Sequence, residues 1–456
     1  MKTAIAGGVK SNVRKGYGSN LLLMVAVAMV IAGLSVAGAS IFAQKEVPAQ
    51  NSVIGDPAAI LASGAGTRTG YADRSIETAQ AAIKLEPNDF KAYASLGFAF
   101  QQKARETNDP TYYAQAEDAL TRALGIKPDY YDAMSGMGQL NLSRHEFGKA
   151  EEWGQKAQAL QPSSPYAYGV IGDAQIELGQ YDAAIASFQQ MVDLRPDLGS
   201  YSRVSYAREL YGDVPGAIDA MQKAVVAGGP AAENTAWCRV QLGNLYFNSN
   251  QLDKAEAAYS DALAGYPNYL HALAGLAQVR WAQGRTDDAI KLYKGAVATV
   301  PLPQYLTSLG DLLESTGDRA GGKEQLDLVL YIFKVFEAGG VNVGAEKAAF
   351  LSDHQIDTAQ AVTLAEEAAR TRQDIHTMDT LAWAYYQVGR YQDAHSAEQK
   401  AMRLGTQNAL FFYHMGMIQS KLGDAAGSQI SLQKALQINP HFSIKYSKEA
   451  AALVRK

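Results

Sequence analysis

The sequence predicts an all-α protein built as a solenoid of repeated helical hairpins. Prolines recur at intervals of 34 residues, at Pro128, Pro162 and Pro196 and again from Pro267 to Pro301. A fixed period of this length is typical of a repeat in which each unit is one pair of helices. Proline is otherwise sparse and alanine is abundant, which favours helices with regular interruptions over a strand-rich sandwich.

Residues 1–43 are expected to be a signal peptide or signal anchor that exports the rest of the chain. Residues 21–43 carry no charge, and a helix of this length, about 35 Å, crosses the roughly 30 Å hydrocarbon core of a bilayer. Four basic residues and no acidic residue precede it, so the positive-inside rule places the following chain in the periplasm or the extracellular space. Small residues before a cut after Ala39 favour cleavage, whereas the length of the apolar run favours a membrane anchor. Both alternatives stay open.

Residues 44–70 are expected to be a flexible linker. They are rich in Ala, Gly, Ser, Pro and Asn and show little helical periodicity. Their glycine-rich run follows no apolar strand and lacks the spacing of a P-loop, so it predicts no phosphate site.

Residues 71–338 and 339–440 are expected to form two successive parts of one array of about ten to eleven repeats. The first unit keeps only its second helix, from Tyr71 to Leu85. Gly339 and Gly340 interrupt a long helical stretch, so the array is expected to bend or divide there.

Two further features concern the ends and turns of the array. Residues 441–456 are expected to form a polar capping helix, because a stacked array must cover its last apolar face. Residues 103–112 are expected to form a longer turn than the other hairpins have, and this turn is a candidate contact surface.

The hairpins share a pattern of small and bulky residues. In each unit a bulky residue and a Gly or Ala in the first helix precede a second helix in which two alanines flank a bulky residue. Small residues let helices approach closely, and large ones fill the adjoining space. Two units that show the pattern contain Met137, Gly138, Ala150 and Ala157, and Leu242, Gly243, Tyr246, Ala255, Tyr259 and Ala262.

This pattern resembles the tetratricopeptide repeat (TPR), and the resemblance covers most of the chain after the linker. It implies a right-handed superhelical solenoid with a C-terminal capping helix. It also implies that the first helix of each pair lines an inner concave groove that binds protein or peptide partners.

The groove positions that the resemblance implies are rich in aromatic residues, including three of the four tryptophans. Aromatic side chains provide a large contact area at a small cost in side-chain entropy. The alternative is that these aromatics belong to the core, since a stripe at helical spacing is more often core than site. The expected partner-binding residues are Trp237, Asn244, Phe247, Asn248, His271, Gln278, Trp281, Trp383 and Tyr386.

Acidic residues at the same positions, such as Asp173, Glu177, Asp311 and Asp379, predict a negative groove. A negative groove favours a protein or peptide that carries basic and apolar residues. Removal of residues 1–43, which carry four positive charges, changes the net charge from −5 to −9. An acidic chain without a basic stripe is not expected to bind nucleic acid. Membrane contact is expected only through residues 21–43 if they are not cleaved.

The sequence predicts no catalytic residue, no metal site and no cofactor, and therefore no enzyme. Its seven histidines are scattered over different units, without a metalloprotease, haem or zinc motif or a nucleophile elbow. They are His145, His271, His354, His376, His395, His414 and His441.

Two functions remain open at this point. The first is an exported scaffold that binds a protein partner through its groove, for example in an envelope assembly. The second is a structural subunit that self-associates or coats a larger extracellular or envelope assembly. The polar C-terminal tail, with Lys445, Lys448 and Glu449, argues mildly against end-to-end stacking.

Overall fold

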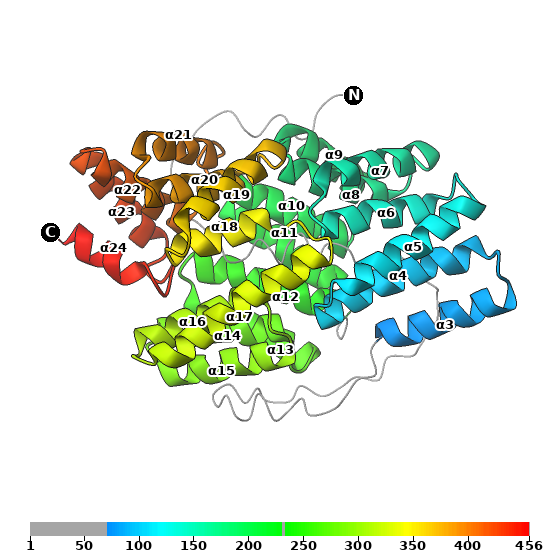
Figure 1. The fold of residues 1–456 in the computed structure, drawn as a ribbon, viewed down its shortest axis with the longest axis horizontal. Coiled ribbons are helices and arrows are strands. Elements are labelled where there is room, and N and C mark those ends of the chain that lie inside the picture. The colour runs from blue at the N-terminus through cyan, green and yellow to red at the C-terminus, as the bar shows by residue number, and fades with distance from the viewer. Residues whose placement is uncertain (1–70, 230–232, 456) are drawn as a thin grey trace.

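The computed structural model describes residues 71–229 and 233–455, and every regular element in these ranges is a helix (Figure 1). The prediction of an all-α helical-repeat solenoid is confirmed. The expected signal segment, residues 1–43, and the expected linker, residues 44–70, lie outside the described residues and stay predictions. Among the helices of the described ranges, none combines the length and the apolar character needed to cross a bilayer.

The described helices form ten consecutive hairpins between a single first helix and a single last helix. The first helix, α3, covers Tyr71–Leu85, as expected for a unit that keeps only its second helix. The hairpins of the first half are α4 (Phe90–Thr107) with α5 (Thr111–Ile126), α6 (Tyr131–Ser143) with α7 (Phe147–Leu160), α8 (Pro165–Glu177) with α9 (Tyr181–Leu194), α10 (Leu198–Leu210) with α11 (Val214–Ala227), and α12 (Glu233–Asn248) with α13 (Leu252–Gly265).

The second half repeats the same arrangement and ends in the last helix, α24 (Ser447–Val454). Its hairpins are α14 (Leu270–Ala282) with α15 (Thr286–Thr299), α16 (Pro303–Ser315) with α17 (Arg319–Ala338), α18 (Gly344–Asp353) with α19 (Thr358–Thr371), α20 (Ile375–Gln387) with α21 (Tyr391–Ala401), and α22 (Ala409–Lys421) with α23 (Ala425–Ile438).

The turn inside most hairpins contains one residue with left-handed backbone. Glycine occupies this position at Gly179, Gly212 and Gly284, where φ is +73°, +76° and +78°. His145 and Asn250 take the equivalent place with φ of +59° and +57°. Glycine is favoured here because side chains strain this conformation, and the turn then directs the second helix back along the first.

The two helices of a hairpin differ in how much of their surface is enclosed. In α8, eleven of the thirteen residues are buried, whereas in α9 five of fourteen are buried. The first helices therefore lie inside the molecule, and the second helices form its outer layer with one apolar face.

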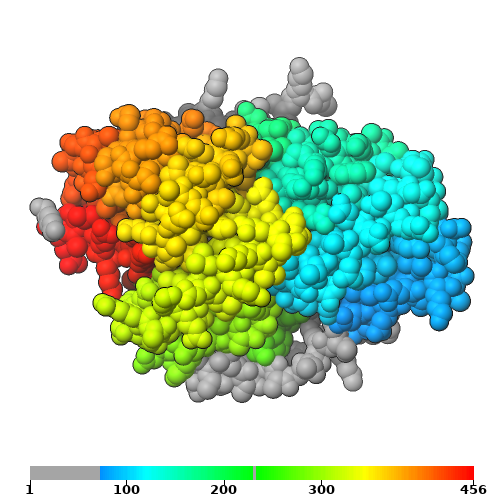
Figure 2. Space-filling model, in the orientation of Figure 1, coloured from blue at the N-terminus to red at the C-terminus, as the bar shows by residue number. Residues whose placement is uncertain are grey.

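The stacking of neighbouring helices is interrupted at one place in the described chain, between α17 and α18. The interruption coincides with Gly339 and Gly340, where a break was expected. The loop after α17 reaches the turn between α6 and α7, where the Asn342 N–H donates to the Arg144 carbonyl at 3.0 Å. Phe333 of α17 and Phe350 of α18 share one core cluster with residues of α4 and α5. The interruption therefore redirects the array without dividing its core, and Figure 2 shows this region, in yellow, against α4 to α6, in cyan.

From α18 onward the chain runs beside its own first half. The Ile375 N–H donates to the Tyr181 hydroxyl at 2.8 Å, and the Asn439 amide donates to the Phe247 carbonyl at 3.1 Å. The Thr406 hydroxyl donates to the Leu210 carbonyl. Each of these bonds joins residues 192 to 196 positions apart. The C-terminal hairpins thus close against α8 to α12, and α18 to α20 lie beside α8 to α10 in Figure 1.

Two boundaries differ from the sequence prediction. The longer turn expected over residues 103–112 is wrong, because α4 continues to Thr107 and the turn is confined to three residues. A Lys103–Asp73 ion pair of 2.7 Å joins this extension of α4 to α3. At the C-terminus the helix begins at Ser447 rather than near residue 441, and Phe442 and Tyr446 are buried beneath it.

Candidate functional site

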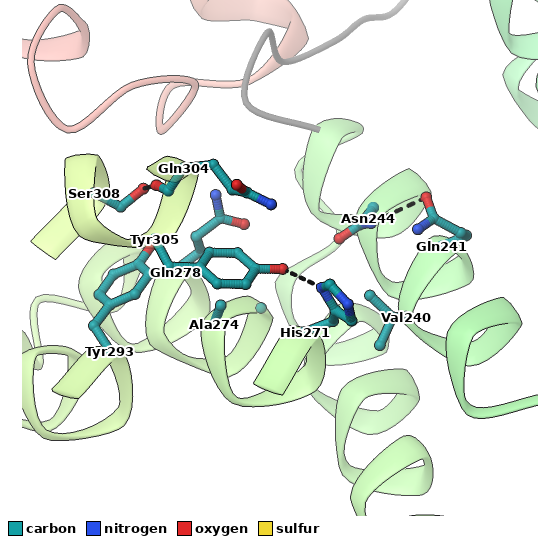
Figure 3. A pocket seen from close by; sticks show the side chains of 11 residues that line it. Val240, Gln241, Asn244, His271, Ala274, Gln278, Tyr293, Gln304, Tyr305 and Ser308 are labelled. Carbon is teal, nitrogen blue, oxygen red and sulfur yellow. Dashed lines mark hydrogen bonds between the residues drawn. The ribbon is translucent and has the colours of Figure 1, made fainter. Parts of the chain in front are cut away.

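A cavity of about 30 Å³, partly open to solvent, forms a hollow between the first helices of three consecutive hairpins, α12, α14 and α16 (Figure 3). Several polar groups converge on this hollow, which is a feature that it shares with ligand-binding sites. The lining consists of Val240, Gln241, Asn244, His271, Ala274, Gly275, Gln278, Tyr293, Gln304, Tyr305 and Ser308.

The repeat itself brings these residues together. His271 and Tyr305 are 34 residues apart, as are Asn244 and Gln278. Equivalent positions of stacked units lie side by side on the same face of a solenoid. Residues that are 34 positions apart in the sequence therefore lie next to each other around one hollow.

Tyr259 packs against two residues that line the hollow, Asn244 and Gly275. Its fully buried ring is flanked by Gly243 of α12 and Gly275 of α14, where a Cβ atom would come within 2.5 and 2.4 Å of the ring. Its hydroxyl donates a 2.7 Å hydrogen bond to Oδ1 of Asn244. Asn244 in turn donates to Oε1 of Gln241 at 3.3 Å. The two glycines thus admit the ring that orients the Asn244 amide.

One wall of the hollow is a neutral histidine paired with a tyrosine. Nδ1 of His271 and the Tyr305 hydroxyl are 2.6 Å apart. Burial lowers the pKa of His271 to about 4, so the imidazole is uncharged near neutral pH. No carboxylate or cation belongs to the lining that the structure describes. The hollow is therefore polar and electrically neutral.

Several polar groups of the lining have no hydrogen-bond partner within the described chain. Both amide atoms of Gln304 are unpaired although only 7% of this residue is exposed. The buried Tyr293 hydroxyl is also unpaired, and the side chain of half-buried Gln278 makes no hydrogen bond to the described chain. Buried polar groups normally find partners, so these atoms call for ordered water or a ligand. Figure 3 shows the Gln278 and Gln304 side chains approaching each other within the hollow.

The structure unites three of the nine expected site residues around the hollow, Asn244, His271 and Gln278. Trp237 and Phe247 are 6% and 1% exposed, and Asn248 is also buried. The expectation that these three side chains are exposed in an open groove is wrong. The C-terminal hairpins cover this part of the inner surface, as the bond from Asn439 to the Phe247 carbonyl shows.

The other expected residues lie away from the hollow's lining. Trp281 is half-buried and packs edge-on against His441, with ring centroids 6.0 Å apart. Trp383 is 3% exposed and stacks between His414 and half-buried Tyr386, at centroid distances of 4.0 and 4.5 Å. The alternative interpretation, that such aromatics belong to the core, holds for Trp383.

The acidic lining expected of the groove is largely paired inside the molecule. The Arg203 guanidinium makes two bonds of 2.8 and 2.7 Å to the Asp173 carboxylate. His354 lies 2.9 Å from Asp311. These two carboxylates are therefore engaged within the molecule and do not form a free negative surface.

Gln304, Tyr305 and Tyr293 were missing from the predicted site. Tyr305 follows His271 by one repeat, and that spacing is a signal that was available in the sequence. Tyr293 follows Tyr259 by one repeat, but that spacing indicated a packing position, and Gln304 gave no signal. Their place at the hollow depends on how α15 and α16 pack on α14.

Three family models, each described as tetratricopeptide repeat, match parts of this chain. One matches residues 113–165 and 240–302, a second matches residues 165–198 and 409–442, and a third matches residues 375–407. The second matched stretch of the first model, residues 240–302, contains most of the residues that line the hollow.

The chain is similar to two curated proteins over part of their length. It is 23% identical over 352 residues to the CTR9 homolog of Arabidopsis thaliana, covering 72% of this chain and 28% of that protein. It is 26% identical over 231 residues to the cellulose synthase 1 operon protein C of Komagataeibacter xylinus, covering 51% of this chain and 15% of that protein. The chain thus spans less than a third of either relative.

Among solved structures, the chain is similar to a thermophilic TPR protein of Thermus thermophilus. The sequence identity is 22% and the TM-score is 0.37, with 43% of this chain and 98% of that chain covered.

Proposed function

We propose that this chain, a tetratricopeptide-repeat protein, is a scaffold that binds a protein partner through the hollow between α12, α14 and α16. Proteins of this superfamily generally mediate protein–protein interactions, and the fold is typically not enzymatic.

One observation carries the assignment, namely the buried amide of Gln304 with both atoms unpaired at a hollow. Leaving a buried donor and acceptor unpaired costs about 1–3 kcal/mol each, relative to a state in which they are bonded. A ligand that pairs both atoms recovers this free energy on binding. A group that pairs with both amide atoms is therefore favoured to bind in this hollow.

The lining also indicates the chemistry of the partner. It offers amide groups, hydroxyl groups and a neutral imidazole, and its charge is zero near neutral pH. Such groups complement peptide bonds, side-chain amides and hydroxyls better than lysine or arginine. We therefore propose an extended, uncharged polar segment, in place of the basic segment that the sequence predicted.

The test replaces Gln304 with leucine, a side chain of similar size without the amide. Gln304→Leu is expected to fold with unchanged or higher stability, because it removes unpaired buried groups. Its affinity for the partner is expected to fall about tenfold or more, the equivalent of one lost hydrogen bond. A photo-crosslinking residue at half-buried Gln278 identifies the partner in the source cells, and calorimetry with partner fragments then measures the affinity.

Gln399→Leu is the matched control, because Gln399 is exposed on α21, outside the lining. Partner binding is expected to survive this change. Equal affinity of Gln304→Leu and Gln399→Leu for the crosslinked partner would show that binding occurs elsewhere. The pair Trp237→Ala and Trp281→Ala is a weaker test, because Trp237 is buried and its loss destabilises the fold.

We also propose that the array is exported and works in an envelope assembly. The support is the uncharged segment at residues 21–43 with basic residues before it. The similarity to the cellulose synthase 1 operon protein C fits a role in polysaccharide export, but covers 15% of that protein. Cell fractionation with N-terminal sequencing tests the proposal, and an intact N-terminus in the cytosolic fraction would contradict it.

Self-association is the second candidate function. It is favoured by a stripe on the outer face of α17, where Leu328, Tyr331 and Val335 are 36%, 63% and 36% exposed. Light scattering at several concentrations tests this function. A mass that rises with concentration in the wild type and not in Tyr331→Lys would support it, and the mass of a single chain throughout would exclude it.

A further inference from the structure

A second group of polar side chains is buried in the C-terminal hairpins, away from the hollow. Asp379 of α20, Glu398 of α21 and His414 of α22 converge from three successive helices. One donor atom from each residue lies within 4.8 Å of the other two, and all three residues are completely buried. Three packed helices therefore place two carboxylates and one imidazole around a single point.

The group has more electron-pair donors than hydrogen-bond partners. Nδ1 of His414 is 2.7 Å from Oδ1 of Asp379. The other Asp379 oxygen, both Glu398 oxygens and Nε2 of His414 have no hydrogen-bond partner in the described chain. The three residues thus hold four buried atoms whose electron pairs have no hydrogen-bond partner.

The charges of the group also require compensation. Within the described ranges, the ion pair with His414 is the only one recorded for either carboxylate. Isolated carboxylates are strongly disfavoured in a protein interior. A proton shared between Glu398 and Asp379 compensates one charge, and burial does raise the pKa of Glu398. A divalent cation compensates both charges and binds one donor atom of each residue.

We propose that Asp379, Glu398 and His414 bind one divalent transition-metal ion, with zinc as the best match. A donor set of one imidazole nitrogen and two carboxylate oxygens suits zinc and its neighbours, whereas magnesium and calcium prefer oxygen donors alone. Donor atoms around tetrahedral zinc are roughly 3.3–3.5 Å apart. Metal binding therefore draws the three side chains inward from their separation of up to 4.8 Å.

The surroundings support a structural ion. The Trp383 ring stacks on His414 with a centroid distance of 4.0 Å and so fixes the imidazole plane. The site joins α20, α21 and α22 and is closed to solvent, so the ion is expected to enter while the hairpins fold. No metal motif is visible in the sequence because the ligands are 19 and 16 residues apart on three helices.

The experiment refolds the full-length protein from denaturant after treatment with a chelator, with and without zinc chloride. Elemental analysis after removal of free zinc is expected to give one zinc ion per chain. The zinc-loaded protein is expected to unfold at a higher temperature than the zinc-free protein. Zinc-free protein that takes up no zinc on refolding, with an unchanged unfolding temperature, would overturn the proposal.

Two variants separate the metal site from its alternatives. Glu398→Gln is expected to fold like the zinc-free wild type, because its amide N–H can donate to Asp379 as a protonated carboxyl does. It is expected to retain less than a tenth of the bound zinc. His395→Gln, on the same helix and outside the cluster, is expected to bind zinc like the wild type. Zinc retained by Glu398→Gln or lost from His395→Gln would place the ion elsewhere and contradict the site.

Discussion

Tyr259 shows how single residues shape the hollow. Its ring fits between two helices only because Gly243 and Gly275 lack a side chain. The same residue orients the Asn244 amide through a 2.7 Å bond. The packing of two glycines and the orientation of one amide in the hollow thus depend on one aromatic ring.

Gly243→Ala is expected to destabilise the protein by about 1–3 kcal/mol, because the added Cβ would lie 2.5 Å from the Tyr259 ring. Urea denaturation followed by circular dichroism measures the change. Gly148→Ala is the matched control, since a Cβ there meets no atom within 4 Å. Equal free energies of unfolding for the two variants would contradict the close approach.

Glu209 makes stability depend on pH. This half-buried residue of α10 has a pKa raised from 4.5 to about 7 by burial. Because the folded-state pKa exceeds the unfolded value, the stabilising contribution is complete below pH 4.5 and is lost as the pH rises through 7. Glu209→Gln is therefore expected to exceed the wild type in stability by ~2 kcal/mol at pH 8 and to differ little at pH 4.

The measurement is the free energy of unfolding of Glu209→Gln and wild type between pH 4 and pH 8. Glu324→Gln provides the control, because Glu324 is exposed on α17. A constant difference between Glu209→Gln and wild type across this range would show that Glu209 titrates normally in the folded protein.

At the scale of elements, α24 closes the open end of the array. Its Ala450 is completely buried, and Glu449 accepts a 2.8 Å hydrogen bond from the Tyr413 hydroxyl of α22. Ala450→Asp is expected to detach this helix, because it buries a charge without a partner. Hydrogen exchange is expected to increase in α22 and α23 and to remain unchanged in α4 to α7.

Ala452→Asp controls for the added charge, because Ala452 lies on the exposed side of the same short helix. Its exchange pattern is expected to match that of the wild type. If Ala450→Asp exchanges like Ala452→Asp, α24 does not protect the array.

The helices were predictable because their signals are local. Pro162 and Pro196 follow the ends of α7 and α9 by two residues, and glycine marks most hairpin turns. The sequence prediction placed the turn after α4 too early. Helix α4 continues past the predicted end because its last turns contact α3 through the Lys103–Asp73 ion pair. Such a contact between helices leaves no mark on the periodicity of either one.

At the scale of the whole molecule, the accessibility of the inner surface was not predictable. Trp237 and Phe247 occupy inner-surface positions of α12, and hairpins near the C-terminus cover that surface. The covering contacts join residues more than 190 positions apart. Repeat periodicity describes neighbouring units only, so the curvature that closes the array has no local signal.

Arg372 is the main polar link between the two halves of the array. Its guanidinium lies 2.7 Å from Glu177 at the end of α8 and 2.7 Å from Glu346 of α18. It also lies 3.1 Å from Asp374. Burial raises the pKa of Glu177 to about 7. The three carboxyls are therefore not all ionised near neutral pH, although a single cation, Arg372, lies among them.

Arg372→Met is expected to destabilise the protein by about 3–5 kcal/mol, because it leaves buried carboxylates without their cation. The loss is also expected to loosen the contact between α8 and α20, so the radius of gyration in small-angle scattering should increase. Arg370→Met is the matched control, since Arg370 is exposed one half-turn earlier on α19. If the two variants share the same unfolding free energy and the same radius of gyration, closure of the array does not depend on this cluster. Apolar packing between α8 to α12 and the C-terminal hairpins would then hold the inner surface closed.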